Sequence, residues 1–296
     1  MTLNKSYYAD VPDALMKRLW DFRANHALCE FQDDKHLWTY YVVGDVQDEA
    51  LLLLHGNGGD AETMFRYIEG FAANFRIIAP NIPRTLKNMD EVANGLSALL
   101  QHEGIEQVHL VGMSFGAAIA QMFMRRFRTM VLEMVITHAV IPSDHLAEII
   151  AMQRRLMQFF PTPLLLWLSR MSFRQSITNS QTLTSPEQRR FWQAYFDELY
   201  QTRLSKGDLL SRARLMLDYH RKNKFKGNDL DDWYGDLLII QSDADDVVSE
   251  GDRGALLGMY TRAYVQTLEG YDHLAPILAA DELLSSISNF LLRPDE

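Results

Sequence analysis

The sequence predicts an α/β fold, in which helices flank a mainly parallel β-sheet and a block of helices is inserted between two of its strands. Short apolar runs alternate with helical patterns through the first half of the chain. The strand signal is then lost over residues 141–232 and returns near the C-terminus. Strands and helices that alternate over short connections favour a parallel sheet, since each parallel crossover needs a helix or a comparable segment.

The first region, residues 38–138, contains the larger part of this sheet. Residues 38–43 are rich in β-branched and aromatic side chains, which favour a strand. Residues 50–54 form a continuous apolar run, typical of a strand buried on both faces. Glycines and prolines end several of the runs. The expected strands are 38–43, 50–54, 76–79, 107–111 and 131–137, and the expected helices are 92–102 and 114–127.

The middle region, residues 141–232, shows helical patterns only. Ser185, followed by Pro186 and by Gln188 at the third helical position, is a favourable helix start, and Ser205 is a second capping residue. An aromatic stripe at helical spacing between them is more typical of a packed core than of a cofactor site. The stripe comprises Phe191, Trp192, Tyr195, Phe196 and Leu199, and the second helix is expected to run through Leu209, Leu215 and Tyr219.

The end of the chain returns to the pattern of the first region. Strands are expected at residues 237–241 and 264–268, and a helix is expected at 281–292. The helical block therefore interrupts a single sheet. We expect an α/β core domain formed by residues 1–140 and 233–296, and a helical lid formed by residues 141–232 over one end of the sheet.

The composition is that of an ordinary globular protein, with 47% apolar and 23% charged residues. The net charge of −10 argues against binding nucleic acid and against adsorption to an anionic membrane, so a small molecule is the expected partner. The single cysteine, Cys29, cannot form an internal disulfide, and we expect it to be buried. No apolar leader is apparent, and the longest apolar run is far below the ~20 residues of a membrane helix. We therefore expect a cytoplasmic protein, whose oligomeric state is left open.

A candidate nucleophile lies in Gly112-Met113-Ser114-Phe115-Gly116, between an expected strand and an expected helix. G-x-S-x-G in this setting is typical of a serine on a sharp turn, whose hydroxyl projects beyond the strand end. The glycines leave room for the turn, and the positive end of the following helix faces developing negative charge. The pattern alone also fits a glycine-rich turn without chemistry. The strand–turn–helix setting favours Ser114 as the nucleophile.

A second glycine-rich turn, His55-Gly56-Asn57-Gly58-Gly59, follows the buried strand 50–54. Such a turn exposes backbone N–H groups, and acyl transfer needs two donors where its intermediate carries a negative oxygen. We assign this oxyanion hole to the backbone N–H groups of Asn57 and Phe115. His55 is expected to brace the turn. The candidate pocket residues are Gly56, Met113 and His138.

His273 is the candidate base. It lies in a loop that directly follows the expected strand 264–268, which places it at the same sheet edge as Ser114. His138, at the end of the expected strand 131–137, is the nearest alternative, and we interpret it as a pocket-lining residue.

The candidate acid lies after the expected strand 237–241. A neutral histidine base requires a carboxylate on its other ring nitrogen. Asp243, Asp245 and Asp246 share one loop, and the two valines that follow should pack this loop so that Asp245 faces the histidine. We therefore expect Asp245 to be the acid, with Asp243 as the alternative.

These motifs resemble the α/β-hydrolase superfamily, in which the order Ser, Asp, His along the chain is expected. The resemblance extends over nearly the whole chain outside the expected lid. It rests on His55-Gly56-Asn57-Gly58, Gly112-Met113-Ser114-Phe115-Gly116, the Asp245 loop and Gly270-Tyr271-Asp272-His273. More narrowly, Trp38-Thr39-Tyr40-Tyr41, Val108-His109-Leu110-Val111-Gly112 and the helix from Ser114 look like the maspardin-like branch. That narrower resemblance implies a protein whose substrate is undefined, or one that acts by binding partner proteins.

The residues and the resemblance together predict a serine hydrolase that cleaves a small apolar carboxylic ester through an acyl-enzyme intermediate. No metal and no organic cofactor is expected, because the usual metal and nucleotide motifs are not found. The same side chains would also serve lactone or amide hydrolysis, carbon–carbon bond cleavage or cofactor-free peroxidation. A catalytically silent binding or scaffold protein is the alternative from another class.

Overall fold

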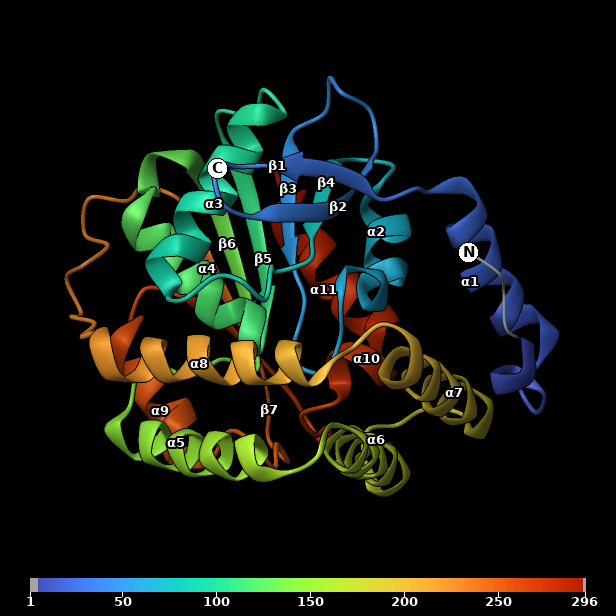
Figure 1. The fold of residues 1–296 in the computed structure, drawn as a ribbon. Coiled ribbons are helices and arrows are strands. Elements are labelled where there is room, and N and C mark those ends of the chain that lie inside the picture. Colours follow the sequence, from blue (N-terminus) through green and yellow to red (C-terminus); the bar gives the residue numbers. More distant parts are fainter. Residues whose placement is uncertain (1–4, 295–296) are drawn as a thin grey trace.

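The computed structural model describes residues 5–294 and contains one eight-stranded sheet with helices on both faces (Figure 1). The strands are β1 (Cys29–Gln32), β2 (Leu37–Val43), β3 (Ala50–Leu54), β4 (Arg76–Pro80), β5 (Val108–Met113), β6 (Val131–Thr137), β7 (Leu237–Ser242) and β8 (Tyr264–Leu268). Their order in the sheet is β1-β2-β4-β3-β5-β6-β7-β8. The β1–β2 and β2–β4 pairs are antiparallel, and every other pair is parallel. The predicted α/β fold class is thereby confirmed.

The helices form an apolar layer on each face of the sheet. They are α1 (Asp13–Asn25), α2 (Phe65–Phe71), α3 (Met89–His102), α4 (Phe115–Arg126), α5 (Asp144–Phe159), α6 (Thr162–Asn179), α7 (Pro186–Thr202), α8 (Lys206–Lys222), α9 (Glu250–Met259), α10 (Ala275–Leu278) and α11 (Ala280–Leu291). One layer includes α1, α2 and α11, and the other includes α3 and α4. Leu51 and Leu53 of β3 pack in the first layer, and Leu52 and Leu54 pack in the second. β3 is therefore buried on both faces, as its apolar run predicted.

Helices α5 to α8 are inserted between β6 and β7, and we call them the helical insertion. α5 packs along α8, and α6 packs along α7 (Figure 1). The hydroxyls of Ser185 and Ser205 accept hydrogen bonds from N–H groups of the first turns of α7 and α8, which confirms both predicted caps. The aromatic stripe of α7 is buried, which confirms its prediction as core.

The N-terminal edge of the sheet differs from the prediction. β1 was not predicted, because it is short and its side chains are mostly exposed. Cys29 begins this strand and is exposed, so the prediction that it is buried was wrong. The physical reason is its position on an edge strand, which has a neighbour on one side only. Within residues 5–294, no helix is both long enough and apolar enough to cross a bilayer.

Candidate active site

Ser114 lies on a sharp turn between β5 and α4. Its φ is +52° and its ψ is −109°, a strained combination for any residue other than glycine. The flanking glycines make this turn possible. A Cβ on Gly112 would lie 2.5 Å from the carbonyl oxygen of Gly116, and a Cβ on Gly116 would clash with the main chain of Leu54. The turn therefore holds the serine at the carboxyl end of β5.

The Ser114 hydroxyl is hydrogen-bonded to His273, which is in turn hydrogen-bonded to Asp245. Ser114 Oγ lies 2.9 Å from His273 Nε2. The other ring nitrogen, Nδ1, lies 2.9 Å and 3.1 Å from the two carboxylate oxygens of Asp245. Asp245 follows β7 and His273 follows β8, which are neighbours in the sheet. One sheet edge thus brings together the three side chains that the sequence singled out.

The carboxylate of Asp245 is held in its ionised form. Its side chain is 1% exposed, and the backbone N–H groups of Val247 and Val248 each donate a hydrogen bond to it at 2.8 Å. Burial opposes ionisation, but the hydrogen bond and charge of His273 and the Val248 N–H outweigh it and hold the pKa of Asp245 below its usual value. Asp245 can therefore fix the tautomer of His273 and stabilise its protonated form.

Asp243, the alternative acid, has a different partner. Its Oδ1 accepts a hydrogen bond from the N–H of Gly270 at 2.7 Å. Gly270 has a φ of +75° and begins the loop that carries His273. Asp243 therefore fastens that loop to the end of β7, whereas Asp245 contacts the imidazole.

The glycine-rich turn after β3 lies beside the nucleophile. A Cβ on Gly56 would lie 3.9 Å from the Cβ of Ser114. Among the described residues, the backbone N–H groups of Asn57 and Phe115 donate no hydrogen bond to another group. Phe115 is the first residue of α4, where helix N–H groups lack an acceptor within the helix. Both groups are therefore free to bind an oxyanion near Ser114.

Two buried side chains brace this turn. His55 Nδ1 lies 2.8 Å from the carbonyl oxygen of Gly56. Burial, together with the nearby charge of Arg212, lowers the pKa of His55 to about 4, so this ring is neutral. From α8, the Arg212 guanidinium donates a hydrogen bond to the carbonyl oxygen of Asn57. The helical insertion therefore helps to set the conformation of the turn.

An apolar cavity of about 310 Å³ opens beside Ser114 and His273. Gly56 and Met113 line it, as the sequence predicted. Its other walls come from the core and from three helices of the insertion. The apolar side chains around it are Met64, Met113, Phe173, Tyr200, Leu209, Val247, Leu274, Pro276 and Ile277.

A second cavity, of about 380 Å³, is also lined by His273. It shares Phe173, Val247 and Leu274 with the first cavity. Most of its remaining lining is polar and neutral. These side chains are Ser172, Gln175, Ser176, Asn179 and Ser180, with Asp246 and Asp272 as the acidic ones. His273 therefore borders both an apolar and a polar space, and Ser114 borders the apolar one.

His138 does not line either cavity, which corrects the prediction that it is a pocket residue. It is buried behind His273, with a ring-to-ring distance of 5.5 Å, and its Nε2 lies 2.8 Å from Ser242 Oγ. The positive φ of 51° at this residue and the hydrogen bond from its N–H to Ile240 keep it in the interior. Burial lowers the pKa of His138 to about 3, so this ring is neutral beside His273.

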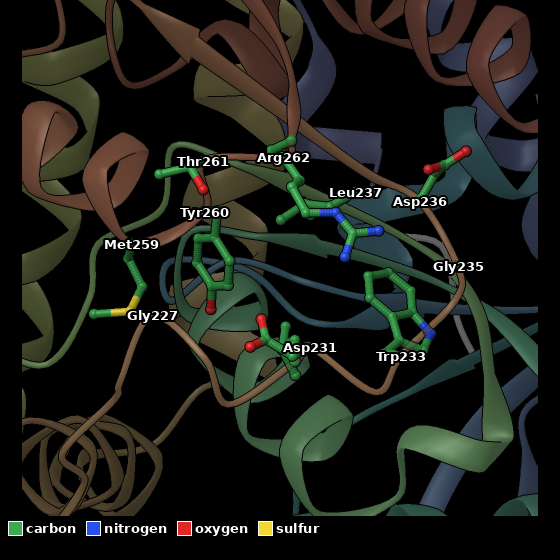
Figure 2. A pocket seen from close by; sticks show the side chains of 12 residues that line it. Gly227, Asp231, Trp233, Gly235, Asp236, Leu237, Met259, Tyr260, Thr261 and Arg262 are labelled. Atoms are coloured by element: carbon green, nitrogen blue, oxygen red, sulfur yellow. The ribbon is translucent and has the colours of Figure 1, made fainter.

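A further cavity lies far from this site (Figure 2). It is formed around Trp233, where the chain enters β7, and around Tyr260, just before β8. Trp233 and Tyr260 precede the amino ends of two parallel strands, whereas Ser114 follows the carboxyl end of β5. The cavity therefore lies at the opposite edge of the sheet. Its volume is about 90 Å³, enough for a few water molecules only. We assign it no part in the chemistry.

Some residues of the site gave no signal in the sequence. Arg212 and Phe173 come from amphipathic helices, in which nothing marks the position that meets the active site. Asp272 belongs to the Gly270-Tyr271-Asp272-His273 motif, but the sequence did not predict its contacts with the insertion. Its carboxylate accepts hydrogen bonds from Thr182 Oγ1 at 2.9 Å and from the N–H of Gln181 at 2.7 Å, and so ties the His273 loop to the insertion.

No group of three or more His, Cys, Asp or Glu side chains within residues 5–294 is arranged to hold a metal ion.

The fold and the hydrogen-bonded serine, histidine and aspartate define a protein of the α/β-hydrolase class. Residues 51–285, well over half of the chain, match the model of the alpha/beta hydrolase family. The chain therefore belongs to this family, which confirms the resemblance seen in the sequence.

Solved structures share the fold at low sequence identity. An alpha/beta hydrolase enzyme from a Medee basin deep-sea metagenome library has a TM-score of 0.72 at 17% identity, and the match covers 90% of this chain and 98% of that one. A carboxylesterase from Bacillus subtilis has a TM-score of 0.64 at 14% identity, covering 95% of this chain and 98% of that one. At such identities the similarity concerns the fold alone.

Sequence relatives match over a shorter stretch. Maspardin of Homo sapiens is 32% identical over 93 residues, which cover 31% of this chain and 30% of maspardin. The magnesium-chelatase 30 kDa subunit of Rhodobacter capsulatus is 32% identical over 92 residues, which cover 28% of this chain and 32% of that subunit. The chain thus matches about a third of the length of these relatives. The maspardin match agrees with the narrower resemblance.

Proposed function

We propose that this protein is a serine hydrolase that cleaves a small, apolar carboxylic ester through an acyl-enzyme intermediate. The observation that carries the proposal is the hydrogen-bonded series Ser114, His273 and Asp245 beside an apolar cavity. Ser114 is the nucleophile, His273 is the base, and Asp245 orients the imidazole.

The reaction follows from this geometry. His273 Nε2 accepts the proton of the Ser114 hydroxyl as Ser114 Oγ attacks the ester carbonyl carbon. The N–H groups of Asn57 and Phe115 stabilise the oxyanion of the tetrahedral intermediate. His273 then donates its proton to the departing alcohol. A water molecule, deprotonated by His273, attacks the acyl-enzyme, and the collapse of the second intermediate releases the acid and restores Ser114.

The two cavities suggest how an ester would be placed. The apolar cavity beside Ser114 has the lining expected for an acyl chain, because apolar side chains bind apolar groups by excluding water. The polar cavity is also lined by His273, which must reach the departing oxygen. We therefore assign the acyl group to the first cavity and the alcohol to the second.

The direct test is labelling with a fluorophosphonate probe, together with hydrolysis of short p-nitrophenyl esters. Ser114→Ala should abolish both labelling and hydrolysis while the thermal midpoint stays close to that of the parent protein. Failure of the correctly folded parent protein to react would exclude the hydrolase proposal and favour a binding or scaffold role.

The acid assignment has its own matched pair of variants. Asp245→Asn should lower kcat by as much as ~10⁴, because the histidine is then held in the wrong tautomer. Asp243→Asn should retain far more activity, since Asp243 contacts the Gly270 N–H and not the ring. A larger loss in Asp243→Asn than in Asp245→Asn would contradict the assignment. A panel of lactones, amides, diketones and peroxidation substrates separates ester cleavage from the other reactions open to the same side chains.

A further inference from the structure

The outer face of α5 and α6 exposes an apolar surface. On each helix, large apolar side chains recur at the spacing of a helical stripe, which normally faces a protein core. Here they face outwards: Phe159 is 86% exposed and Trp167 is 54% exposed. Figure 1 shows these two helices at the outermost edge of the insertion. We call the set the outer stripe, and it comprises Met152, Leu156, Phe159, Phe160, Leu164, Trp167, Leu168 and Met171.

Burial within this chain does not account for the outer stripe. The comparable stripe on α7, which includes Trp192 and Tyr195, is buried against the core. Single exposed apolar residues are common, but eight large ones along two helices that follow one another directly in the chain indicate a surface that meets a partner. The partner must therefore come from outside the described chain.

The charge around the outer stripe identifies the kind of partner. Residues 149–186 contain four arginines and no aspartate or glutamate, although the whole chain has a net charge of −10. Arg154 and Arg155 lie on α5, where Arg154 is half-buried and Arg155 is exposed within the stripe. Arg170 and Arg174 on α6 share one carboxylate, Asp197, so one positive charge of the pair remains uncompensated there.

Other polar groups near the stripe agree with this charge. The Lys206 ammonium group donates hydrogen bonds to the carbonyl oxygens of Gln158 and Phe160, at the turn between α5 and α6. The nearest acidic residues of these helices, Asp144 and Glu148, lie at the start of α5, away from α6. The turn and the adjoining halves of both helices are therefore apolar and positively charged.

We propose that the outer stripe docks the protein on an anionic lipid bilayer surface. Amphipathic helices with apolar aromatic faces and flanking arginines insert their apolar side into the headgroup region, and anionic lipids attract the arginines. A second copy of this chain fits less well, because it would bring the arginines of both copies together. The net charge of the whole chain predicted no membrane contact, but the acidic residues responsible for it lie on other parts of the chain.

The docking surface and the active site share helix α6. Phe173, from the same helix as Trp167, lines both cavities. A bilayer bound to the outer stripe would therefore contact the helix that forms part of the wall of both cavities. Docking does not depend on the proposed hydrolysis, so the Ser114→Ala variant should bind lipid as the parent protein does.

Trp167 provides a built-in reporter. Of the other tryptophans, Trp38, Trp192 and Trp233 are buried and Trp20 is partly buried. We expect the protein to co-sediment with phosphatidylcholine vesicles that contain phosphatidylglycerol, and not with pure phosphatidylcholine vesicles. Its tryptophan emission should shift to shorter wavelength on binding. Trp167→Phe should retain binding and lose most of that shift.

Two further variants test the surface itself. Phe159→Ser should remove most of the binding, and the double variant Arg154→Gln/Arg155→Gln should weaken it at least tenfold and reduce its salt dependence. Two matched controls lie outside the outer stripe. Tyr234→Ser changes an aromatic residue that is 94% exposed, and Arg221→Gln changes an exposed arginine on α8. Neither control should alter binding.

Several results would overturn the proposal. These are no co-sedimentation with phosphatidylglycerol vesicles, equal binding to both vesicle types, or binding that the Phe159 and arginine variants leave unchanged. A dimer in solution that Phe159→Ser dissociates, without vesicle binding, would assign the outer stripe to a second copy instead.

Discussion

Arg212 gives the sharpest test of how the helical insertion serves the site. Its guanidinium, on α8, donates a hydrogen bond to the carbonyl oxygen of Asn57, in the turn that we assign to the oxyanion hole. The side chain is buried, and that burial lowers its own pKa. Arg212→Gln shortens the side chain and removes the charge, so the turn loses this brace. Arg212 is a positioning residue, because it contacts the turn and not the reacting atoms.

The magnitude follows from the kind of bond that is lost. A hydrogen bond from a charged donor contributes about 1.5–3 kcal/mol, and a tenfold change in rate corresponds to about 1.4 kcal/mol. If the brace acts mainly in the transition state, kcat should fall by about 10-fold to 150-fold with little change in KM. The variant should also raise the pKa of His55, because the charge of Arg212 helps to lower it.

The assay is the hydrolysis of a short p-nitrophenyl ester, with kcat and KM measured separately, alongside the rate of fluorophosphonate labelling. Arg214 is the matched control, since it lies on the same helix and donates to the carbonyl oxygens of Arg84 and Leu86 away from the site. Arg214→Gln should keep its kcat. If both variants lose kcat equally, or if the loss in Arg212→Gln tracks a lower thermal midpoint, the positioning role is refuted.

Three other comparisons predict effects on the free energy of unfolding, measured by chemical denaturation. Gly116→Ala should cost about 3 kcal/mol or more, because its Cβ would meet the main chain of β3, whereas Gly258→Ala, in open space on α9, should add about 0.5–1 kcal/mol. Burial lowers the pKa of His138 from an ordinary 6.5 to about 3, so the unfolded chain gains a proton below pH 6.5 that the native protein does not accept. Stability should therefore fall by about 2 kcal/mol between pH 7 and pH 5, and His138→Gln should remove that share of the fall. Arg23→Met should cost about 3–5 kcal/mol, because Arg23 joins two buried glutamates, whereas Lys17→Met in an exposed pair should cost at most about 1 kcal/mol. Equal losses for the two glycine variants would contradict the steric explanation for Gly116. A pH dependence that survives in His138→Gln would contradict the assignment to His138. Equal losses for Arg23→Met and Lys17→Met would contradict the role of burial in the Arg23 ion pairs.

The strands of the core were the most predictable part of the fold. Residues 50–54, 131–137 and 264–268 were predicted with the bounds that β3, β6 and β8 have. Aliphatic, aromatic or β-branched residues predominate in these segments and a polar residue follows each, so local composition indicates them. β1 and the individual helices α5 and α6 were not predicted. The side chains of β1 are mostly exposed, and the apolar stripes of α5 and α6 face outwards, so in neither case does the sequence show which face meets the core.

The part of the site that could be predicted is the part that follows from the direction of the strands. Carboxyl ends of parallel strands share an edge, and this brings Ser114, Asp245 and His273 into contact. Contacts between distant elements were not predictable. The partner of Arg212 is a backbone carbonyl, which carries no sequence signature, and the interior position of His138 depends on an unusual φ at a strand end. The lid role of residues 141–232, the compartment and the small-molecule partner stay predictions.

The place at which the insertion interrupts the chain has a consequence for how this family can diversify. The chain leaves the sheet after β6 and returns at β7, so the insertion divides the sequence between Ser114 and its two hydrogen-bonded partners in the series, Asp245 and His273. Strand pairing places the three loops that carry those side chains at one sheet edge. The contacts of Arg212 with Asn57 and of Asp272 with Thr182 and Gln181 tie the turn after β3 and the His273 loop to the insertion. Helices α5 to α8 can therefore vary in length and sequence during evolution as long as these contacts are kept. Swapping this segment between relatives should change which molecules are accepted, and it should lower kcat where the swapped segment lacks the arginine.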